Sequence, residues 1–490
     1  MARPRRGFGK SKLEAPTRER NEFMVTREQA ADVFDRVRKL SSADEVEVLF
    51  SGGSFALTRF ANSVIHQNVS EENISVSVRT LFDGRTARAT TNRLEDDDLR
   101  RVVQACESLA KVQHRDPDLL PMPDANEALA SACGLRPTGT VLSRHFAETA
   151  SITPAWRAYQ AEKIVGVAKR NKLTTAGICS SAESFEGIFN SRGVSDWHLQ
   201  TLAEVSITML GESSSGWQKL NSPDAAQLDA ERLGEVAAQK ARQSAHPQEM
   251  APGKYTVILE PSAVLDIVGF MFWDFSGTAL LEQRSFLTGR MGAKLFGDNI
   301  TIWDDVAHPL QAGAPFDGEG MRRARIPLVE NGFIRSVVYS RATAAQMLRS
   351  ELSAKVGPVA ATGHGFPLPN EMGEMPLNIA FAPPDDPPTV EQMIASTERG
   401  LLVTRLWYIR EVEPFEKMLT GMTRDGTFLV ENGRIKCGVR NFRFNESLIH
   451  MLSNVEQMGQ PVRSCGEESF DMVAPAMKVR DFNFTEVTRF

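Results

Sequence analysis

The sequence contains little histidine, and its few histidines are scattered. Only eight occur among 490 residues, and no two of them lie within a helical turn or two of each other. A zinc site carried on one helix needs closely spaced histidines, as in HExxH, together with a carboxylate base. The sequence therefore lacks the local ligand pair from which a helix-borne catalytic zinc site is assembled.

Cysteine is also sparse, and long apolar runs are missing. The five cysteines (106, 133, 179, 437 and 465) form no CxxC pair, which is typical of a reduced protein without a structural zinc knuckle. The first 22 residues contain no apolar segment of the secretory kind. The longest apolar run, Ala263–Leu281, is interrupted by two aspartates and is too short to span a bilayer. We therefore expect a cytoplasmic protein that does not enter a membrane.

Other signatures of catalysis and nucleic-acid binding are absent too. The sequence has no GxSxG elbow, no phosphate-binding loop of the Walker type and no GxGxxG after a strand. Its net charge of −6 argues against direct nucleic-acid binding. The one basic run, Arg3–Lys12, continues to Arg20 and predicts a disordered tail over residues 1–22, with a contact arm as the alternative.

The first half predicts an α+β domain over residues 23–245, in which helices flank an antiparallel sheet. One helix is expected from Thr26 to about Leu40, where Thr26 and Gln29 suit a capping box, and three more helices are expected later in this half. Residues 113–150, rich in Pro, Asp and Ala, indicate a connector. The predicted strands are Glu45–Phe50, Ala56–Phe60, Val64–Val69, Ile74–Leu81, Thr86–Thr91, Thr174–Phe189 and Val194–Leu210, and the later helices are Glu95–Val112, Trp156–Lys172 and Asp224–Ala245.

The second half, residues 246–490, predicts a β-rich domain with a few helices. The segment His246–Gly253, which contains turn-forming residues, marks the predicted boundary between the two domains. Its central stretch is Val257–Leu287, in which a strand leads to a helix that begins at Pro261. Leu265, Val268, Phe272 and Phe275 recur with the period of one buried helical face. Asp266 and Asp274 lie two turns apart, too far to chelate one ion unaided, so we interpret them as solvated or salt-bridged.

Three further groups are candidates for chemistry or binding. Phe316–Gly320 (FDGEG) suits a turn with capping acids, or a contact that orients a peptide or a neighbouring subunit. His364, between glycines in the predicted loop Gly357–Asn370, is expected to be exposed and within reach of a partner. Cys465 stands in a polar stretch and would be a ligand or a reactive thiol only beside other ligands. His198 and His450 are expected to be packed.

Several short segments follow one another in a specific order and spacing along the chain. Those in the second half are Arg284–Leu287 (RSFL), Gly292–Phe296 (GAKLF), Phe316–Gly320 (FDGEG), Thr362–Gly365 (TGHG), Gly400–Leu406 (GLLVTRL), Glu431–Ile435 (ENGRI) and Asn445–Leu448 (NESL). In the first half the match is weaker and is carried by Arg59–Gln67 (RFANSVIHQ). Together these segments resemble the TldD/PmbA family, and specifically its PmbA (TldE) branch, over roughly residues 25–485.

The resemblance implies where a metal would lie in relatives. TldD-type chains carry HExxxH on a helix after a strand and a proline, and a cysteine near the C-terminus is a third ligand. The corresponding stretch here is about Gly269–Asp274 (GFMFWD), without histidine or glutamate, whereas Cys465–Gly466 resembles the Cys-Gly element. This pattern fits the PmbA branch, which is similar in fold and lacks the metal motif. It implies no catalytic residue, cofactor or metal in this chain, with Cys465 and His364 as the only candidate ligands if a site exists.

The resemblance also implies partners. A TldD-like metallopeptidase subunit that holds the zinc, and an unfolded peptide bound as an added strand, are expected, whereas no membrane or nucleic-acid partner is. The sequence therefore predicts a non-catalytic subunit of a zinc metallopeptidase complex. A stand-alone peptide-binding homodimer, and a peptidase with an unrecognised site, remain as alternatives.

Overall fold

The computed structural model describes residues 24–129 and 142–488. The predicted basic tail, residues 1–22, lies outside the described residues, as does Cys133. Within these two ranges, no helix combines the length and the apolar character that crossing a bilayer would require.

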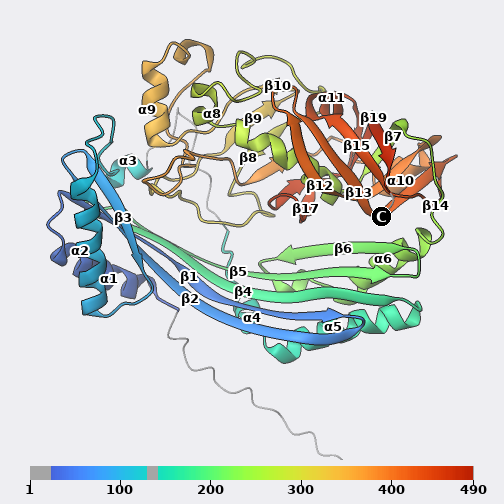
Figure 1. Cartoon of the computed structure of the whole chain (residues 1–490), viewed down its shortest axis with the longest axis horizontal. Helices are drawn as coiled ribbons and strands as arrows, with labels where there is room; N and C mark the ends of the chain where they lie inside the picture. Colours follow the sequence, from blue (N-terminus) through green and yellow to red (C-terminus); the bar gives the residue numbers. More distant parts are fainter. Residues whose placement is uncertain (1–23, 130–141, 489–490) are drawn as a thin grey trace, which may run out of the picture.

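The first half is built on one antiparallel sheet of long, curved strands (Figure 1). Two long strands pair from Glu45 opposite Leu81 to Ala61 opposite Val64, with one register shift between Arg59 and Phe60. Across the sheet the order is β3 (Arg85–Thr91), β2 (Val64–Phe82), β1 (Glu45–Ala61), β4 (Thr174–Asn190), β5 (Ser195–Leu210) and β6 (Ser215–Ser222).

The four short strands predicted between residues 45 and 81 are wrong, because β1 and β2 each run through without a break. Gly52 and Gly53, which fall between the first two predicted strands, are strand residues that let neighbouring backbones approach closely. A Cβ on Gly53 would lie 2.0 Å from the carbonyl oxygen of Glu183, and its φ of 144° also favours glycine.

Helices cover one face of this sheet. The capping box predicted at Thr26 and Gln29 is confirmed at the start of α1. Helices α1 and α2 enclose one apolar core with β1, β2 and β4, and α5 and α6 enclose a second core farther along the same strands. The helical segments are α1 (Arg27–Leu40), α2 (Asp96–Val112), α3 (Ala125–Leu129), α4 (Ala147–Ala150), α5 (Pro154–Arg170), η2 (Ala225–Gln227) and α6 (Ala230–Gln243).

The strands of the second half form a closed ring and a smaller mixed sheet. In the ring each strand pairs with the next, β7 and β12 in parallel and the rest antiparallel, and β12 with β13 completes the circuit. The ring strands are β12 (Arg399–Glu413), β7 (Gly253–Leu259), β19 (Met477–Val487), β15 (Phe442–Ser447) and β13 (Met418–Glu431), to which β14 (Arg434–Gly438) and β16 (Val455–Met458) are attached.

The smaller sheet lies beside the ring (Figure 1), and both reach the first half, because β13 contacts β6 and α6 while β17 contacts β6. Its order is β10 (Phe333–Ile334), β9 (Ile326–Glu330), β8 (Ile302–Asp304), β11 (Ile379–Phe381), β18 (Met472–Ala474) and β17 (Val462–Ser464). The helical segments of this half are α7 (Pro261–Val268), η3 (Gly269–Asp274), α8 (Gly277–Leu281), α9 (Arg341–Arg349), η4 (Ser353–Lys355), α10 (Val390–Ala395) and α11 (Leu448–Ser453).

The predicted α+β fold class, with a helix-flanked antiparallel sheet followed by a strand-rich half, is confirmed. Some local predictions are wrong. The strand predicted over Phe333–Tyr339 is only two residues long, and the helix predicted from Asn445 begins at Leu448 because residues 442–447 pair in the ring. The helix predicted through Phe275 changes to a 3₁₀ segment at Gly269.

Candidate functional site

Helix α7 places a buried carboxylate, Asp266, between strand β12 and the loop after Cys465. Pro261 occupies the first turn of α7, directly after strand β7. Asp266 accepts hydrogen bonds from the backbone N–H groups of Leu406 (3.2 Å), Glu467 (3.3 Å) and Glu468 (3.3 Å). Burial raises the pKa of Asp266 to about 7, against the lowering effect of these three N–H groups. The prediction that Asp266 is solvated or salt-bridged is therefore wrong.

The Cys-Gly element lies directly against this helix. A Cβ on Gly466 would be 2.4 Å from Oδ1 of Asp266, and one on Gly269 would collide with Ser469. Cys465 is buried, and burial raises the pKa of its thiol to about 12. We call the group formed by Asp266, Leu406 and Cys465–Glu468 the α7 site.

The residues at the α7 site do not provide the ligands that a zinc ion needs. Both oxygens of Asp266 already accept backbone N–H groups, and the α7 site contains no histidine. Within the part of the chain that the structure describes, no group of three His, Cys, Asp or Glu side chains is arranged to hold a metal.

Asp274, at the end of η3, is buried and forms an ion pair with Lys417, which also contacts Glu411 at 2.8 Å. Its carboxylate accepts a hydrogen bond from the backbone N–H of Phe286 at 3.2 Å. For this residue the salt-bridged interpretation is confirmed.

His364 is buried, so the prediction that it is exposed on a loop is wrong. Its Nε2 lies 2.8 Å from Oδ1 of Asp304, and its Nδ1 lies 3.0 Å from the hydroxyl of Thr362. Burial alone would raise the pKa of Asp304, but His364 outweighs it and holds that pKa below its usual value. Because Asp304 also accepts the N–H groups of Leu377 and Asn378, His364 is part of the scaffold that positions these loops.

The FDGEG and TGHG segments form one unit. Asp317 accepts hydrogen bonds from the N–H groups of Glu319 and Met321 in its own turn and from Gly365 in the other segment, the last at 2.7 Å. The prediction of a turn with capping acids is confirmed. Glu319 accepts the N–H of Arg341 at 2.9 Å, whereas its second oxygen is buried without a hydrogen-bond partner. Burial, reinforced by Asp317, raises the pKa of Glu319 to about 8.

A cavity of about 610 Å³ separates these two segments from the sheet of the first half. We call it the junction cleft. Strand residues Leu49–Gly52, Asn73, Ser77, Arg88 and Ser184–Gly187 line one side, and Phe316–Gly318, Arg323, His364–Pro367 and Leu377 line the other. His364 and the FDGEG segment therefore meet at this cleft, whereas Cys465 belongs to the α7 site.

Beside the cleft lies a buried ion cluster that the sequence analysis missed. Glu47 is 2.6 Å from Arg88 and 3.7 Å from Arg79, and Arg88 also donates to the carbonyl of Leu368 in the second half. Glu47 stands between two valines in the strand, a position that alternation alone would assign to solvent. Instead that face of the sheet is covered by the second half.

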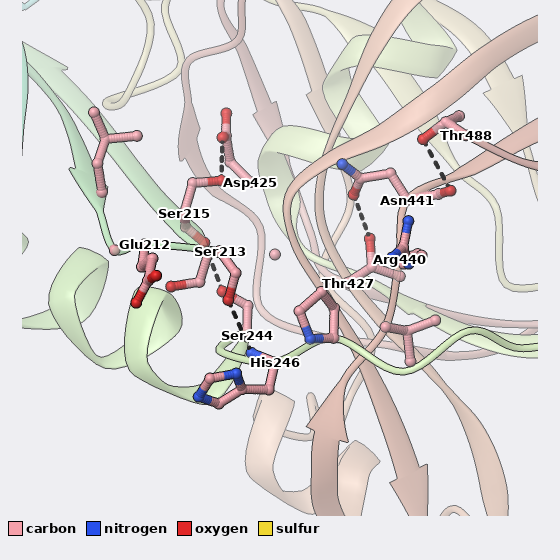
Figure 2. Close-up of a pocket in the computed structure, with 16 residues that line it drawn as sticks. Glu212, Ser213, Ser215, Ser244, His246, Asp425, Thr427, Arg440, Asn441 and Thr488 are labelled. Carbon is pink, nitrogen blue, oxygen red and sulfur yellow. Dashed lines mark hydrogen bonds between the residues drawn. The ribbon is translucent and has the colours of Figure 1, made fainter. Parts of the chain in front are cut away.

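A second cavity, of about 700 Å³, lies where the chain passes from α6 to β7. Figure 2 shows its polar lining, in which Ser215 bonds to Asp425 at 2.7 Å and Thr427 to Asn441 at 3.2 Å. Ser213 accepts a hydrogen bond from the backbone N–H of His246 at 3.3 Å. None of the candidate ligands or motif segments lines this cavity.

His198 and His450 were both expected to be packed. His198 is buried and lies 3.3 Å from Gln200, as expected. The ring of His450 is 41% exposed and pairs with Glu446 at 2.7 Å, so it is only partly packed.

Comparison with known proteins places these features in a family. A model of the PmbA/TldA metallopeptidase C-terminal domain matches residues 252–486, and a model of domain 1 of the same family matches residues 46–110, so that together they match more than half of the chain. The chain is 22% identical to metalloprotease PmbA of Escherichia coli O157:H7 over 461 residues, which are 90% of this chain and 92% of PmbA.

Two further similarities extend the comparison. The chain is 27% identical over 172 residues to an uncharacterised protein of Methanocaldococcus jannaschii, an alignment that spans 34% of this chain and 40% of the archaeal one. The crystal structure of TldE from Thermococcus kodakarensis superposes with a TM-score of 0.77 at 18% identity, covering 93% of this chain and 99% of TldE. The chain therefore belongs to the PmbA/TldA metallopeptidase family and has a TldE-like fold.

Proposed function

We propose that the chain is a non-catalytic, TldE-like subunit of a zinc metallopeptidase complex that degrades or processes unfolded peptides, in which a TldD-like partner subunit holds the zinc. The observation that carries this proposal is the state of Asp266. In a metallopeptidase family, the helix that begins at Pro261 presents a carboxylate both of whose oxygens accept backbone N–H groups. Asp266 supports the packing of α7 against β12 and leaves no ligand for a metal.

Such a subunit would have a structural role and a binding role. It would complete the space in which peptide is cut and contribute surfaces that hold the partner and the peptide. The long sheet of the first half supports this role, because β3 pairs with β2 only over residues 76–82. The outer edge of β2 before Val76 has no neighbouring strand among the described residues, so its backbone groups are available to an extended chain.

Co-expression with a TldD-type chain tests the proposal. We expect the two chains to co-purify, zinc to be present at about one ion per pair, and an unfolded substrate such as fluorescein-labelled casein to be cleaved only by the pair. Replacing the glutamate of the partner's HExxxH motif should abolish cleavage without affecting assembly. Near-stoichiometric zinc and cleavage with the purified chain alone would overturn the proposal.

A further inference from the structure

The junction cleft combines a floor of small residues with walls of apolar ones. Ser51 on β1 and Ser184 on β4 have short side chains, so that the space above the strands remains open. The walls include Leu49 from the sheet, and Phe316, Phe366 and Leu377 from the second half. A volume of about 610 Å³ lies within the range of small-ligand and peptide-side-chain pockets.

The upper wall of the cleft is held rigidly by buried contacts. Asp304 fixes His364, and Asp317 fixes the backbone N–H of Gly365, the residue before Phe366. Gly318 also donates to the carbonyl of Gly365 at 2.9 Å. Because these groups are already satisfied within the chain, the cleft needs no ligand to form, and binding would carry a smaller ordering cost.

An exposed aromatic side chain packs against Phe366 without itself lining the cleft. Trp273, at the end of η3, stacks on Phe366 with ring centroids 6.5 Å apart and an interplanar angle of 29°. Its side chain remains 44% exposed. Rigid aromatic side chains at the edge of a cavity provide much of the binding energy where peptides and proteins are recognised.

Charge at the cleft does not favour a strongly charged ligand. Arg88 and Arg323 line it, but Glu186 lines it as well, and Arg88 is paired with Glu47. Asp317 is saturated by backbone N–H groups. An uncharged group with an aromatic or aliphatic surface therefore suits the cleft better than a phosphate or a nucleotide.

We propose that the junction cleft binds an apolar or aromatic side chain of an extended peptide against Phe366, with Trp273 supporting that ring from outside. The identity of the ligand as an unfolded peptide rests on the proposed function. The cleft thereby becomes a selective peptide subsite on the non-catalytic subunit.

Fluorescence anisotropy on the purified chain alone tests this proposal without the partner. Two fluorescein-labelled, C-terminally amidated peptides serve as probes, GSGFGSG and its matched control GSGSGSG. We expect the peptide with phenylalanine to bind at least about tenfold more tightly than the control, the difference that one buried aromatic anchor provides.

Variants locate the site. Phe366→Ala should weaken binding of GSGFGSG about tenfold, and Ser51→Trp, which fills the cleft from the exposed strand face, should abolish it. Trp273→Ala should have a smaller effect of about threefold. Tyr408→Ala is the matched control, because Tyr408 is an exposed aromatic residue (52%) that does not line the cleft, and it should leave affinity unchanged.

Equal affinity for the two peptides, or unchanged affinity in both Phe366→Ala and Ser51→Trp, would overturn the proposal. A second result would also overturn it: neither peptide binds, and the two variants impair assembly with a TldD-type chain. The cleft would then bind a segment of the partner and not a peptide substrate. Selective binding by a chain that never assembles with such a partner would instead support the subsite and contradict the proposed function.

Discussion

The α7 site and the junction cleft differ in how they use buried charge. At the α7 site one carboxylate is surrounded by apolar residues and satisfied by three backbone N–H groups, and the neighbouring cysteine is buried. Around the cleft, Glu47, Asp317 and Glu319 are all buried, and Glu47 and Glu319 each keep an oxygen without a hydrogen-bond partner.

This difference separates a region whose buried carboxylate is held by backbone N–H groups from a region that borders an open space. A buried polar group that is fully satisfied by backbone contributes to packing and has little left to bind a ligand. Incompletely satisfied groups beside a cavity are costly to keep and often accompany binding or catalysis. Recognition is therefore expected at the cleft and not at α7.

The largest expected effect concerns the ion cluster beside the cleft. Glu47→Gln removes the charge that compensates Arg79 and Arg88, so we expect the free energy of unfolding to fall by about 3–5 kcal/mol. Urea denaturation measures this loss. Glu231→Gln is the control, because its pair with Arg170 is half-exposed on both sides and should change stability by less than about 1 kcal/mol. A loss at Glu47 as small as the control's would show that the cluster is not a structural requirement.

A second prediction concerns the α7 site. Asp266→Asn keeps the shape of the side chain but turns an NH₂ group toward one of the backbone N–H donors, and should lower stability by about 1–3 kcal/mol. Zinc content, measured by mass spectrometry on the same samples, should be equally low in both proteins. If Asp266→Asn were neutral for stability but lowered bound zinc, Asp266 would be a ligand and the comparison between the two regions would fail.

The sequence predicted the elements whose signals are local. Thr26 and Gln29 specified a helix start, and the alternation of Ile74, Val76 and Val78 specified which face of β2 is buried, because both depend on residues a few positions apart. The continuity of β1 was missed at Gly53, whose conformation makes sense only beside Glu183, far away in the sequence.

The candidate site was less predictable, for the same reason. His364 was placed on an exposed loop because glycines and prolines surround it, yet its burial depends on Asp304, sixty residues earlier. Cys465 has polar neighbours in sequence, yet it is buried beside Arg463, Asp471 and Asn221, the last on strand β6 of the first half. The pairing of FDGEG with TGHG through Asp317 and Gly365 likewise has no signal at short range.

A third prediction uses the protonation of Glu319. Its pKa is about 8 in the folded protein and near 4.5 when unfolded, so the folded state retains a proton that the unfolded state has lost between these values. The resulting stability is fully present below pH 4.5 and is lost as the pH rises toward 8, at up to roughly 1 kcal/mol per pH unit.

Glu319→Gln replaces the protonated acid by a neutral group of the same shape. We expect thermal unfolding between pH 5 and 8 to depend less on pH in this variant than in the original chain, and the variant to be the more stable of the two at pH 8. Identical pH profiles would show that Glu319 is ionised in the folded protein, and the contrast between the two regions would weaken.

The smallest expected effect is on thiol reactivity, and it tests the α7 site from a different direction. Burial raises the pKa of Cys465 to about 12, whereas Cys437 on β14 is only half-buried. Since the thiolate is the reactive form, native protein should react with iodoacetamide at Cys437 well before Cys465. Mass spectrometry of the modified peptides measures the two rates, and denatured protein, in which both thiols are accessible, is the control. Rapid modification of Cys465 in the native chain would mean that the Cys-Gly loop opens, and a loop that opens would expose Asp266 to solvent and to metal ions.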